Sequence, residues 1–247
     1  MNGSAERSPL VPVAVAVALG VVGFVVGALV AQIGATLAAA AFGIERGTPS
    51  MTLVGLLGQG VGLVGVGYVY LRSRDRTLSY IRIRQPDLRD VAVGVVGTVA
   101  LFAYLTAVVA VVNYLDVSLA EHSVVDVIER NPSVALLLVP ASVLVTGPTE
   151  EFLYRGVVQS RLRERFAVPA TVLVAAAPFA LVHVPAYLVF STPAETMTTV
   201  TVVLFPLGIL LGLYYEYTEN LVVPAVVHGV YNAVVFGINY ADVVGVG

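Results

Sequence analysis

The sequence predicts an all-α protein, a polytopic bundle of seven membrane-spanning helices. Hydrophobic residues make up 58% of the 247 residues and charged residues only 12%, about half the charged share of a soluble domain. A soluble chain of this length could not bury so much apolar surface, so lipid is the expected solvent for most of it. Charged residues divide the chain into seven uncharged stretches, which are Ser8–Ile44, Gly47–Leu71, Val91–Leu115, Asn131–Thr149, Phe166–Ala194, Thr196–Tyr215 and Asn220–Ala241.

The lengths of these stretches fit one crossing each in most cases, because a spanning helix needs about 20 apolar residues. Ser8–Ile44 is longer, yet it is too short for two full crossings and a turn. It therefore predicts one long tilted helix, or a helix followed by an interfacial piece. The fourth stretch must continue to about Gln159 if its end is to reach the cytosol.

The arginine residues predict the orientation of the bundle. Residues 72–90 hold six arginines, and residues 161–165 hold three more. Under the positive-inside rule both clusters lie in the cytosol. Seven crossings then place the N-terminus, with Arg7, in the cytosol as well, and leave only Arg46 and Arg130 outside.

The chain divides into two regions. Residues 1–131 are expected to form an N-terminal region of three spans, with the basic cytosolic loop 72–90. Apolar residues alternate with charged ones near the end of this region, which predicts an outer interfacial helix at about residues 118–130. Residues 132–247 are expected to form a core of four spans that carries the chemistry.

The first motif of this core places Glu150, Glu151 and Arg155 inside an apolar stretch. Three charges at the centre of a bilayer would oppose insertion by roughly 8–10 kcal/mol, so they must be paired, hydrated or used. Arg155 follows Glu151 by four residues on one helix face, in the favourable order. Glu150 points about 100° away. We expect Arg155 to neutralise Glu151 and to leave Glu150 free as a base, although a purely stabilising ion pair is the alternative.

A histidine in the next span lies at the same depth as Glu150. The basic turn between the two spans centres near Phe166, with Glu150 before it and His183 at a similar distance after it. Both helices rise by about 1.5 Å per residue, so an antiparallel hairpin brings the carboxylate and the imidazole to one level. We therefore expect Glu150 and His183 to face each other.

The last span carries His228 and Asn232, four residues apart on one helix face. Two polar side chains on an otherwise apolar helix need an interior partner. The third histidine, His122, is interpreted as an ordinary interfacial residue.

Together these side chains predict hydrolysis inside the membrane. A desolvated glutamate can take a proton from water, and a histidine can hold that water or bind a metal. A second histidine and an asparagine amide can donate hydrogen bonds to an oxyanion. Gly-x-Ser-x-Gly and His-Glu-x-x-His are both absent, which argues against serine and zincin-type sites.

These three motifs resemble the CAAX protease and bacteriocin-processing (CPBP) family of intramembrane proteases, which includes the type II CAAX prenyl endopeptidases. The family pattern is Glu-Glu-x-x-x-Arg, then Phe-x-x-x-His, then His-x-x-x-Asn/Asp. The matching positions are Glu150, Glu151, Arg155, Phe179, His183, His228 and Asn232. The resemblance implies an all-helical membrane endopeptidase whose site opens toward the cytosolic half, and many members have eight spans.

The resemblance also implies a role for each matched residue. Glu150 and His183 would activate water, His228 and Asn232 would stabilise the oxyanion, and Glu151, Arg155 and Phe179 would support them. Under this resemblance a divalent metal such as zinc, if bound, would take Glu150, His183 and His228 as donors, and no thiolate is available because cysteine is absent. Whether a metal is bound stays open at this stage.

The expected setting is a multi-pass protein of the cell membrane that acts on a membrane protein or a lipidated peptide. The net charge of −3 does not indicate nucleic acid. Two other functions stay open, a non-proteolytic bacteriocin-immunity or scaffold protein on the same fold and an ion-coupled transporter. The sequence says nothing about oligomeric state.

Overall fold

A computed structural model describes residues 10–246, and these residues form helices and connecting loops with no strand among them. Seven helices of this part are long and apolar enough to cross a membrane. The prediction of a polytopic helical bundle is therefore confirmed, with seven rather than eight spans in the described chain. The predicted cytosolic N-terminus and Arg7 lie outside the described residues.

Four of the seven spans are single helices, and three contain breaks. The single helices are α1 (Leu10–Phe42), α2 (Pro49–Ser73), α3 (Leu88–Tyr114) and α12 (Val222–Val244). The broken spans consist of α5 (Ser133–Ala141), α6 (Gly147–Glu151) and α7 (Ser160–Arg163), of α8 (Val168–Leu181) and α9 (Val184–Tyr187), and of α10 (Pro193–Thr199) and α11 (Phe205–Thr218). Wider π-helical segments at Ser142–Thr146, Phe152–Gln159 and Val200–Leu204 join the pieces of the first and third of these.

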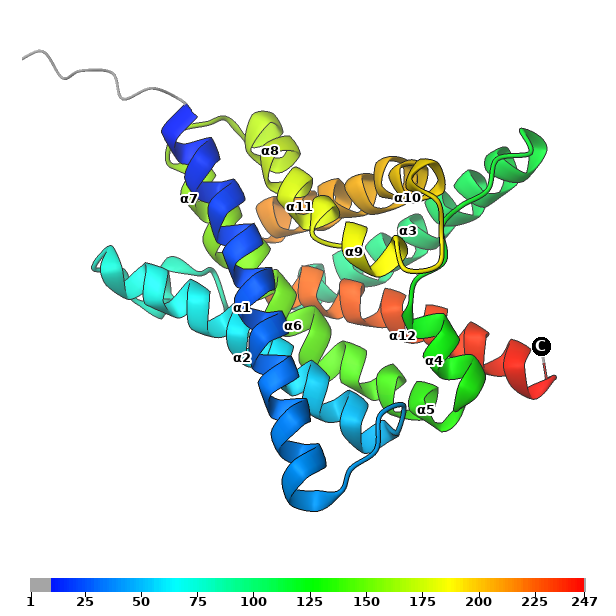
Figure 1. Cartoon of the computed structure of the whole chain (residues 1–247). Helices are drawn as coiled ribbons and strands as arrows, with labels where there is room; N and C mark the ends of the chain where they lie inside the picture. The colour runs from blue at the N-terminus through cyan, green and yellow to red at the C-terminus, as the bar shows by residue number, and fades with distance from the viewer. Residues whose placement is uncertain (1–9, 247) are drawn as a thin grey trace, which may run out of the picture.

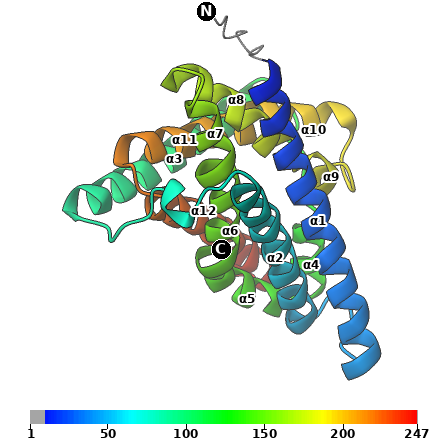
Figure 2. The same cartoon turned by 90° about the vertical axis from the view of Figure 1, so that its left-hand side faces the viewer.

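The long first stretch forms one helix, α1, which was the first of the two predictions made for it. Its 33 residues extend over about 50 Å, well beyond the roughly 30 Å of a hydrocarbon core. Figures 1 and 2 show α1 lying obliquely across one side of the bundle, next to α2. The two helices touch backbone to backbone, since a Cβ on Gly62 would lie 2.3 Å from the Cα of Gly27.

One end of the bundle, which we call the basic face, is formed by the loops 74–87, 164–167 and 219–221. Ion pairs join these loops, with Arg76 NH2 3.3 Å from Glu164 Oε1 and Arg82 NH1 3.3 Å from Glu219 Oε1. The Leu221 N–H also donates to the Arg82 carbonyl at 2.7 Å. The two arginine-rich segments of the sequence therefore share one face, as the positive-inside rule requires.

The opposite end, which we call the α4 face, is formed by the loops 43–48, 115–132 and 188–192. The Asn131 amide donates to the Gly47 carbonyl at 3.0 Å. The Glu121 N–H donates to Ser191 Oγ, also at 3.0 Å. In Figure 1 this end lies to the right, where α4, α9, α10 and the C-terminal end of α12 gather.

The helix of the α4 face is shorter than the sequence predicted. α4 covers Val124–Arg130, and residues 118–122 are not helical. The reason is that backbone N–H groups in this stretch bond outside it, from Ala120 to Thr199 Oγ1 at 2.7 Å and from Glu121 to Ser191 Oγ. These bonds draw residues 118–122 over the ends of the neighbouring spans instead of into a helical turn.

Candidate active site

The paired glutamates lie in a helix that is wound differently on either side of them. α6 is flanked by the π-helical segments Ser142–Thr146 and Phe152–Gln159, and π-helical turns are rare and often found at functional sites. Gly147 opens α6 and lies directly against α12, because a Cβ there would be 2.4 Å from the Ala225 carbonyl oxygen. This close approach brings the glutamates of α6 next to His228 of α12.

Glu151 is completely buried, and one of its carboxylate oxygens accepts hydrogen bonds from two side chains. Its Oε1 lies 2.9 Å from Arg155 NH1 and 2.9 Å from His228 Nδ1. Arg155 also donates to the Gly208 carbonyl of α11 at 2.9 Å. The expected pairing of Glu151 with Arg155 is present, and the bond from His228 to the same carboxylate is an addition that the sequence did not reveal.

Glu150 faces both imidazoles of the core. Its Oε2 lies 3.9 Å from His183 Nε2 and 4.0 Å from His228 Nε2. This oxygen is buried and has no hydrogen-bond partner, while the side chain as a whole keeps 17% of its surface exposed. Glu150 and His183 thus lie at the same depth, as their similar distances from the turn near Phe166 predicted. His228 of α12 lies at this depth as well.

The hydrogen bonds at Nδ1 fix the orientation of both imidazoles. His183 Nδ1 lies 2.7 Å from the Phe179 carbonyl oxygen, and His228 Nδ1 bonds the Glu151 carboxylate. A carbonyl and a carboxylate only accept, so each Nδ1 carries a hydrogen and donates it. In the neutral rings each Nε2 therefore keeps a lone pair, and both of these nitrogens lie beside Glu150.

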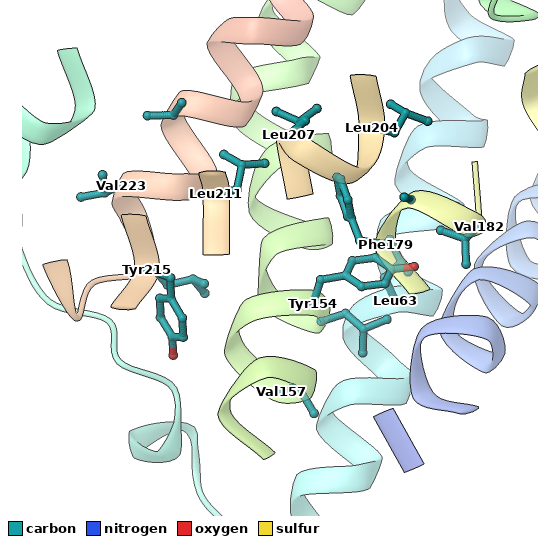
Figure 3. Close-up of a cluster of buried hydrophobic side chains, with 14 of the residues drawn as sticks. Leu63, Tyr154, Val157, Phe179, Val182, Leu204, Leu207, Leu211, Tyr215 and Val223 are labelled. Atoms are coloured by element: carbon teal, nitrogen blue, oxygen red, sulfur yellow. The ribbon is translucent and has the colours of Figure 1, made fainter. Parts of the chain in front are cut away.

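Phe179 packs between the functional side chains. Its ring is fully buried, with ring centroids 5.1 Å from His183 and 5.7 Å from His228. The Arg155 guanidinium carbon lies 4.3 Å from the ring centroid, which is a cation–π contact. Figure 3 shows Phe179 beside Tyr154 in the apolar cluster. Phe179 thus supports both imidazoles and Arg155 from one position.

A cavity of about 340 Å³ opens next to Glu150. His183, His228 and Asn232 all line it, so the structure brings together the four candidate catalytic residues of the sequence. The Asn232 amide has no hydrogen-bond partner among residues 10–246. It is a free donor at the wall of the cavity.

Four further polar residues besides tyrosines line the cavity, Gln59, His122, Thr146 and Asn239, and none was assigned to the site from the sequence. Gln59 of α2 is one of them, and its only signal was that it is an amide inside an apolar span. His122 is another; the sequence interpreted it as an ordinary interfacial residue, and the structure places it in the lining of the cavity. Its ring stands edge-on to Tyr187, with centroids 4.9 Å apart, and Nδ1 accepts from the Val124 N–H at 3.1 Å. Burial, aided by nearby His183, lowers the pKa of His122 to about 4, so this ring is neutral at neutral pH.

The direction of the cavity differs from what the resemblance implied. Its lining includes His122, Val124 and Val125 of the α4 face, and no residue of the basic-face loops. Toward the basic face the space is filled, because Arg155 and Gln159 are fully buried there. The cavity therefore extends away from the basic face, and the expected opening toward the cytosolic half stays a prediction.

The donors around Glu150 match a divalent metal in chemistry but are spaced more widely than a formed site. Carboxylate oxygen and neutral imidazole nitrogen are ordinary zinc ligands, and two ligands of a tetrahedral zinc lie about 3.4 Å apart. The Glu150–His183 and Glu150–His228 separations are 3.9 and 4.0 Å. No group of three His, Cys, Asp or Glu side chains in the described residues has direct metal-binding spacing. Glu150, His183 and His228 could close around a metal by small side-chain movements.

Comparison with known proteins agrees with the motifs. Residues 132–234 match the family model described as type II CAAX prenyl endopeptidase Rce1-like. No curated protein and no solved structure matches the chain significantly. The matched range holds all seven motif positions, from Glu150 to Asn232. The recognition made from these motifs is thereby confirmed, and the chain carries an Rce1-like domain of the type II CAAX prenyl endopeptidases at residues 132–234.

Proposed function

We propose that this protein is an intramembrane endopeptidase that uses Glu150 and His183 to activate water. The observation that carries the proposal is the buried, unpartnered Glu150 Oε2, which lies about 4 Å from two imidazole nitrogens beside a cavity. These atoms are too far apart to bond directly. One water molecule could donate one hydrogen to Glu150 Oε2 and the other to an imidazole Nε2, with hydrogen bonds of ordinary length, about 2.8 Å.

The reaction follows from the chemistry of these groups. Glu150 takes a proton from the water, and the oxygen attacks the carbonyl carbon of the scissile peptide bond. The Asn232 amide donates to the oxyanion, and so does His228 Nε2 when this ring carries its second proton. Glu150 then passes its proton to the leaving amine as the bond breaks.

Glu151 and Arg155 serve this reaction by holding His228. The Glu151 carboxylate binds His228 Nδ1 and is itself held by Arg155. A carboxylate behind an imidazole fixes both the tautomer and the direction of the ring. We assign Glu151, Arg155 and Phe179 positioning roles, because Glu151 and Phe179 contact the imidazoles and Arg155 holds Glu151.

A divalent metal stays a prediction. Glu150, His183 and His228 would hold it, and a bound metal would lower the pKa of water and polarise the scissile carbonyl. The substrate class proposed here is a membrane protein or a lipidated peptide, because the site lies within the spans. A multi-pass location in the cell membrane is part of the same proposal.

The test is cleavage of a membrane-bound peptide by the purified protein in liposomes. Glu150→Gln keeps the size of the side chain but removes the base, so we expect a loss of about 10²–10⁴-fold in rate. Glu45→Gln is the matched control, because this carboxylate is exposed in the loop 43–48 and should change nothing. Metal content, and cleavage with and without a chelator, are measured on the same sample. Cleavage by Glu150→Gln at the rate of the unaltered protein would contradict the mechanism.

A further inference from the structure

The walls of the cavity come from one half of the bundle only. α2 runs from the α4 face to the basic face, and it contributes Leu56, Gln59 and Leu63 from its first half and middle. α12 runs the other way, and its contribution extends from His228 to Asn239, toward its end at the α4 face. The cavity therefore extends from Glu150 toward the α4 face.

The end of the cavity at the α4 face is bordered by loop and short-helix residues. His122, Val124 and Val125 contribute from the segment before and within α4, and Ala186 and Tyr187 contribute from α9. The Ser123 N–H donates to the Ala186 carbonyl at 3.0 Å, which ties the two sides of this border together. We call this border the mouth.

The other end of the cavity is closed by two layers. Tyr154, Phe179 and Leu207 form an apolar floor and are each at most 3% exposed. Figure 3 shows these three side chains in one cluster. A passage through this floor would have to displace close-packed aromatic rings.

Behind the floor lies a layer of buried, hydrogen-bonded polar side chains. Gln159 Nε2 donates to the Gly212 carbonyl at 3.0 Å and to Glu216 Oε1 at 2.9 Å. Ser160 Oγ and the Tyr215 hydroxyl lie 3.1 Å apart and share a hydrogen bond. Opening a path here would leave several buried polar groups unpaired, at about 1–3 kcal/mol for each.

The residues of the mouth and walls determine which kind of peptide the cavity can bind. Among residues 10–246, Glu150 is the only carboxylate of the lining, and no arginine contributes to it. Most other lining residues are apolar, such as Phe24, Val182 and Phe236. An anionic segment would lose its hydration here without gaining a cationic partner, and a cationic group would find only Glu150, the proposed base. An uncharged, largely apolar segment loses little hydration on entry.

We propose that the substrate is an uncharged, largely apolar peptide segment that enters from the α4 face, through the mouth, on the side of the membrane opposite the arginine-rich loops. Under the positive-inside rule this is the outer side of the cell membrane. That the segment is cleaved rests on the proposed function above, but the route of access does not.

The chain has no cysteine, so single cysteines can report on access directly. Val125→Cys probes the mouth and Gln59→Cys the wall. Glu45→Cys and Thr77→Cys are reference positions on the α4 face and the basic face. Leu144→Cys is the lipid control, because Leu144 is 74% exposed on the outer surface of the fourth span. Intact cells that express each variant are treated with a small, membrane-impermeant thiosulfonate, which reacts with thiolates in water.

We expect Val125→Cys, Gln59→Cys and Glu45→Cys to react in intact cells. Thr77→Cys should react only after the membrane is permeabilised, and Leu144→Cys at least about ten-fold more slowly than Val125→Cys, since a thiol in lipid stays protonated. Reaction of Val125→Cys and Gln59→Cys only together with Thr77→Cys would overturn the proposal. So would a rate for both as low as that of Leu144→Cys, or a Glu45→Cys that reacts only after permeabilisation.

Cleavage in liposomes separates failure of the route from failure of the proposed function. The rate of Val125→Cys before modification is the reference, and modification at this position should lower that rate by at least ten-fold. Modified protein that cleaves as fast as before would overturn the mouth as the path of the substrate. Protein that reacts as expected at Val125→Cys but never cleaves any peptide would contradict the endopeptidase proposal and leave the route of access standing.

Discussion

On the side of Glu150 that faces the basic loops, the polar side chains Arg155, Gln159 and Ser160 are buried and each has at least one hydrogen-bond partner. On the side that faces α4, the Asn232 amide and Glu150 Oε2 border a cavity and have no partner among the described residues. The boundary between the two halves runs through one pair of neighbours, since Glu151 belongs to the first set and Glu150 to the second.

This difference separates polar side chains that stabilise the fold from polar side chains that are available to a substrate. A paired polar group inside a membrane protein can join helices, whereas an unpaired one that borders a cavity can bind a ligand there. Glu151 Oε2 and Gln159 Oε1 of the first half also lack a partner among the described residues, but neither residue lines the cavity. The half toward the basic face should therefore respond to mutation mainly in stability. The half toward the α4 face should respond mainly in activity.

The largest effect on stability is expected when the buried ion pair of Glu151 and Arg155 loses its arginine. Arg155→Met removes the partner of a Glu151 carboxylate that has no exposed surface, so we expect the free energy of unfolding to fall by about 3–5 kcal/mol. Thermal unfolding of the purified protein in detergent measures this loss.

The matched control for this prediction is the double variant Arg155→Met with Glu151→Gln. It no longer buries an unpaired charge, so it should recover much of the loss in stability. An Arg155→Met protein that unfolds at the temperature of the unaltered chain would show that this half does not depend on the pair, and the comparison would break down.

The parts of this site that could be predicted from sequence are those set by position along one helix or one hairpin. The pairing of Glu151 with Arg155 follows from a spacing of four residues, and the facing of Glu150 and His183 from equal distances to a turn. Both depend only on the rise and periodicity of an α-helix. The span count follows in the same way, from the length of each apolar stretch.

The parts that could not be predicted depend on contacts between distant segments. The bond from His228 to Glu151 joins residues 77 positions apart, and it requires the close packing of α6 on α12 at Gly147. His122 reaches the cavity because residues 118–122 bond to neighbouring spans instead of forming a helix. The closed floor toward the basic face likewise arises from packing among several spans. No local periodicity reports such contacts.

An intermediate effect is expected at the α1–α2 contact, next to the lining residue Leu63. Gly62→Val places side-chain atoms where a Cβ would already lie 2.3 Å from the Gly27 Cα, so overpacking should lower stability by about 1–3 kcal/mol. Gly65→Val, one turn away on α2, is the control, because a Cβ at this position would have no neighbouring atom within 4 Å. Equal unfolding temperatures for the two variants would mean that α1 and α2 can move apart without loss of stability. The close backbone contact between them would then not contribute to the stability of the protein.

The smallest effect on stability is expected at Asn232, and the same substitution in the other half provides the contrast. Asn232→Ala removes an amide without a partner, so stability should stay within about 0.5 kcal/mol, while loss of an oxyanion donor should slow cleavage by about 10²–10³-fold. Asn220→Ala removes a buried amide that donates to Asp90 Oδ2 at 3.0 Å and accepts from the Arg84 N–H at 3.3 Å. It should lower stability by about 1–3 kcal/mol and leave the rate per folded molecule unchanged. If the two halves differ as described, Asn232→Ala loses activity but not stability, and Asn220→Ala loses stability but not activity. Both properties are measured on both variants. A stability loss at Asn232 as large as that at Asn220 would show that the amide of α12 is a structural group, and it would remove Asn232 from the proposed site.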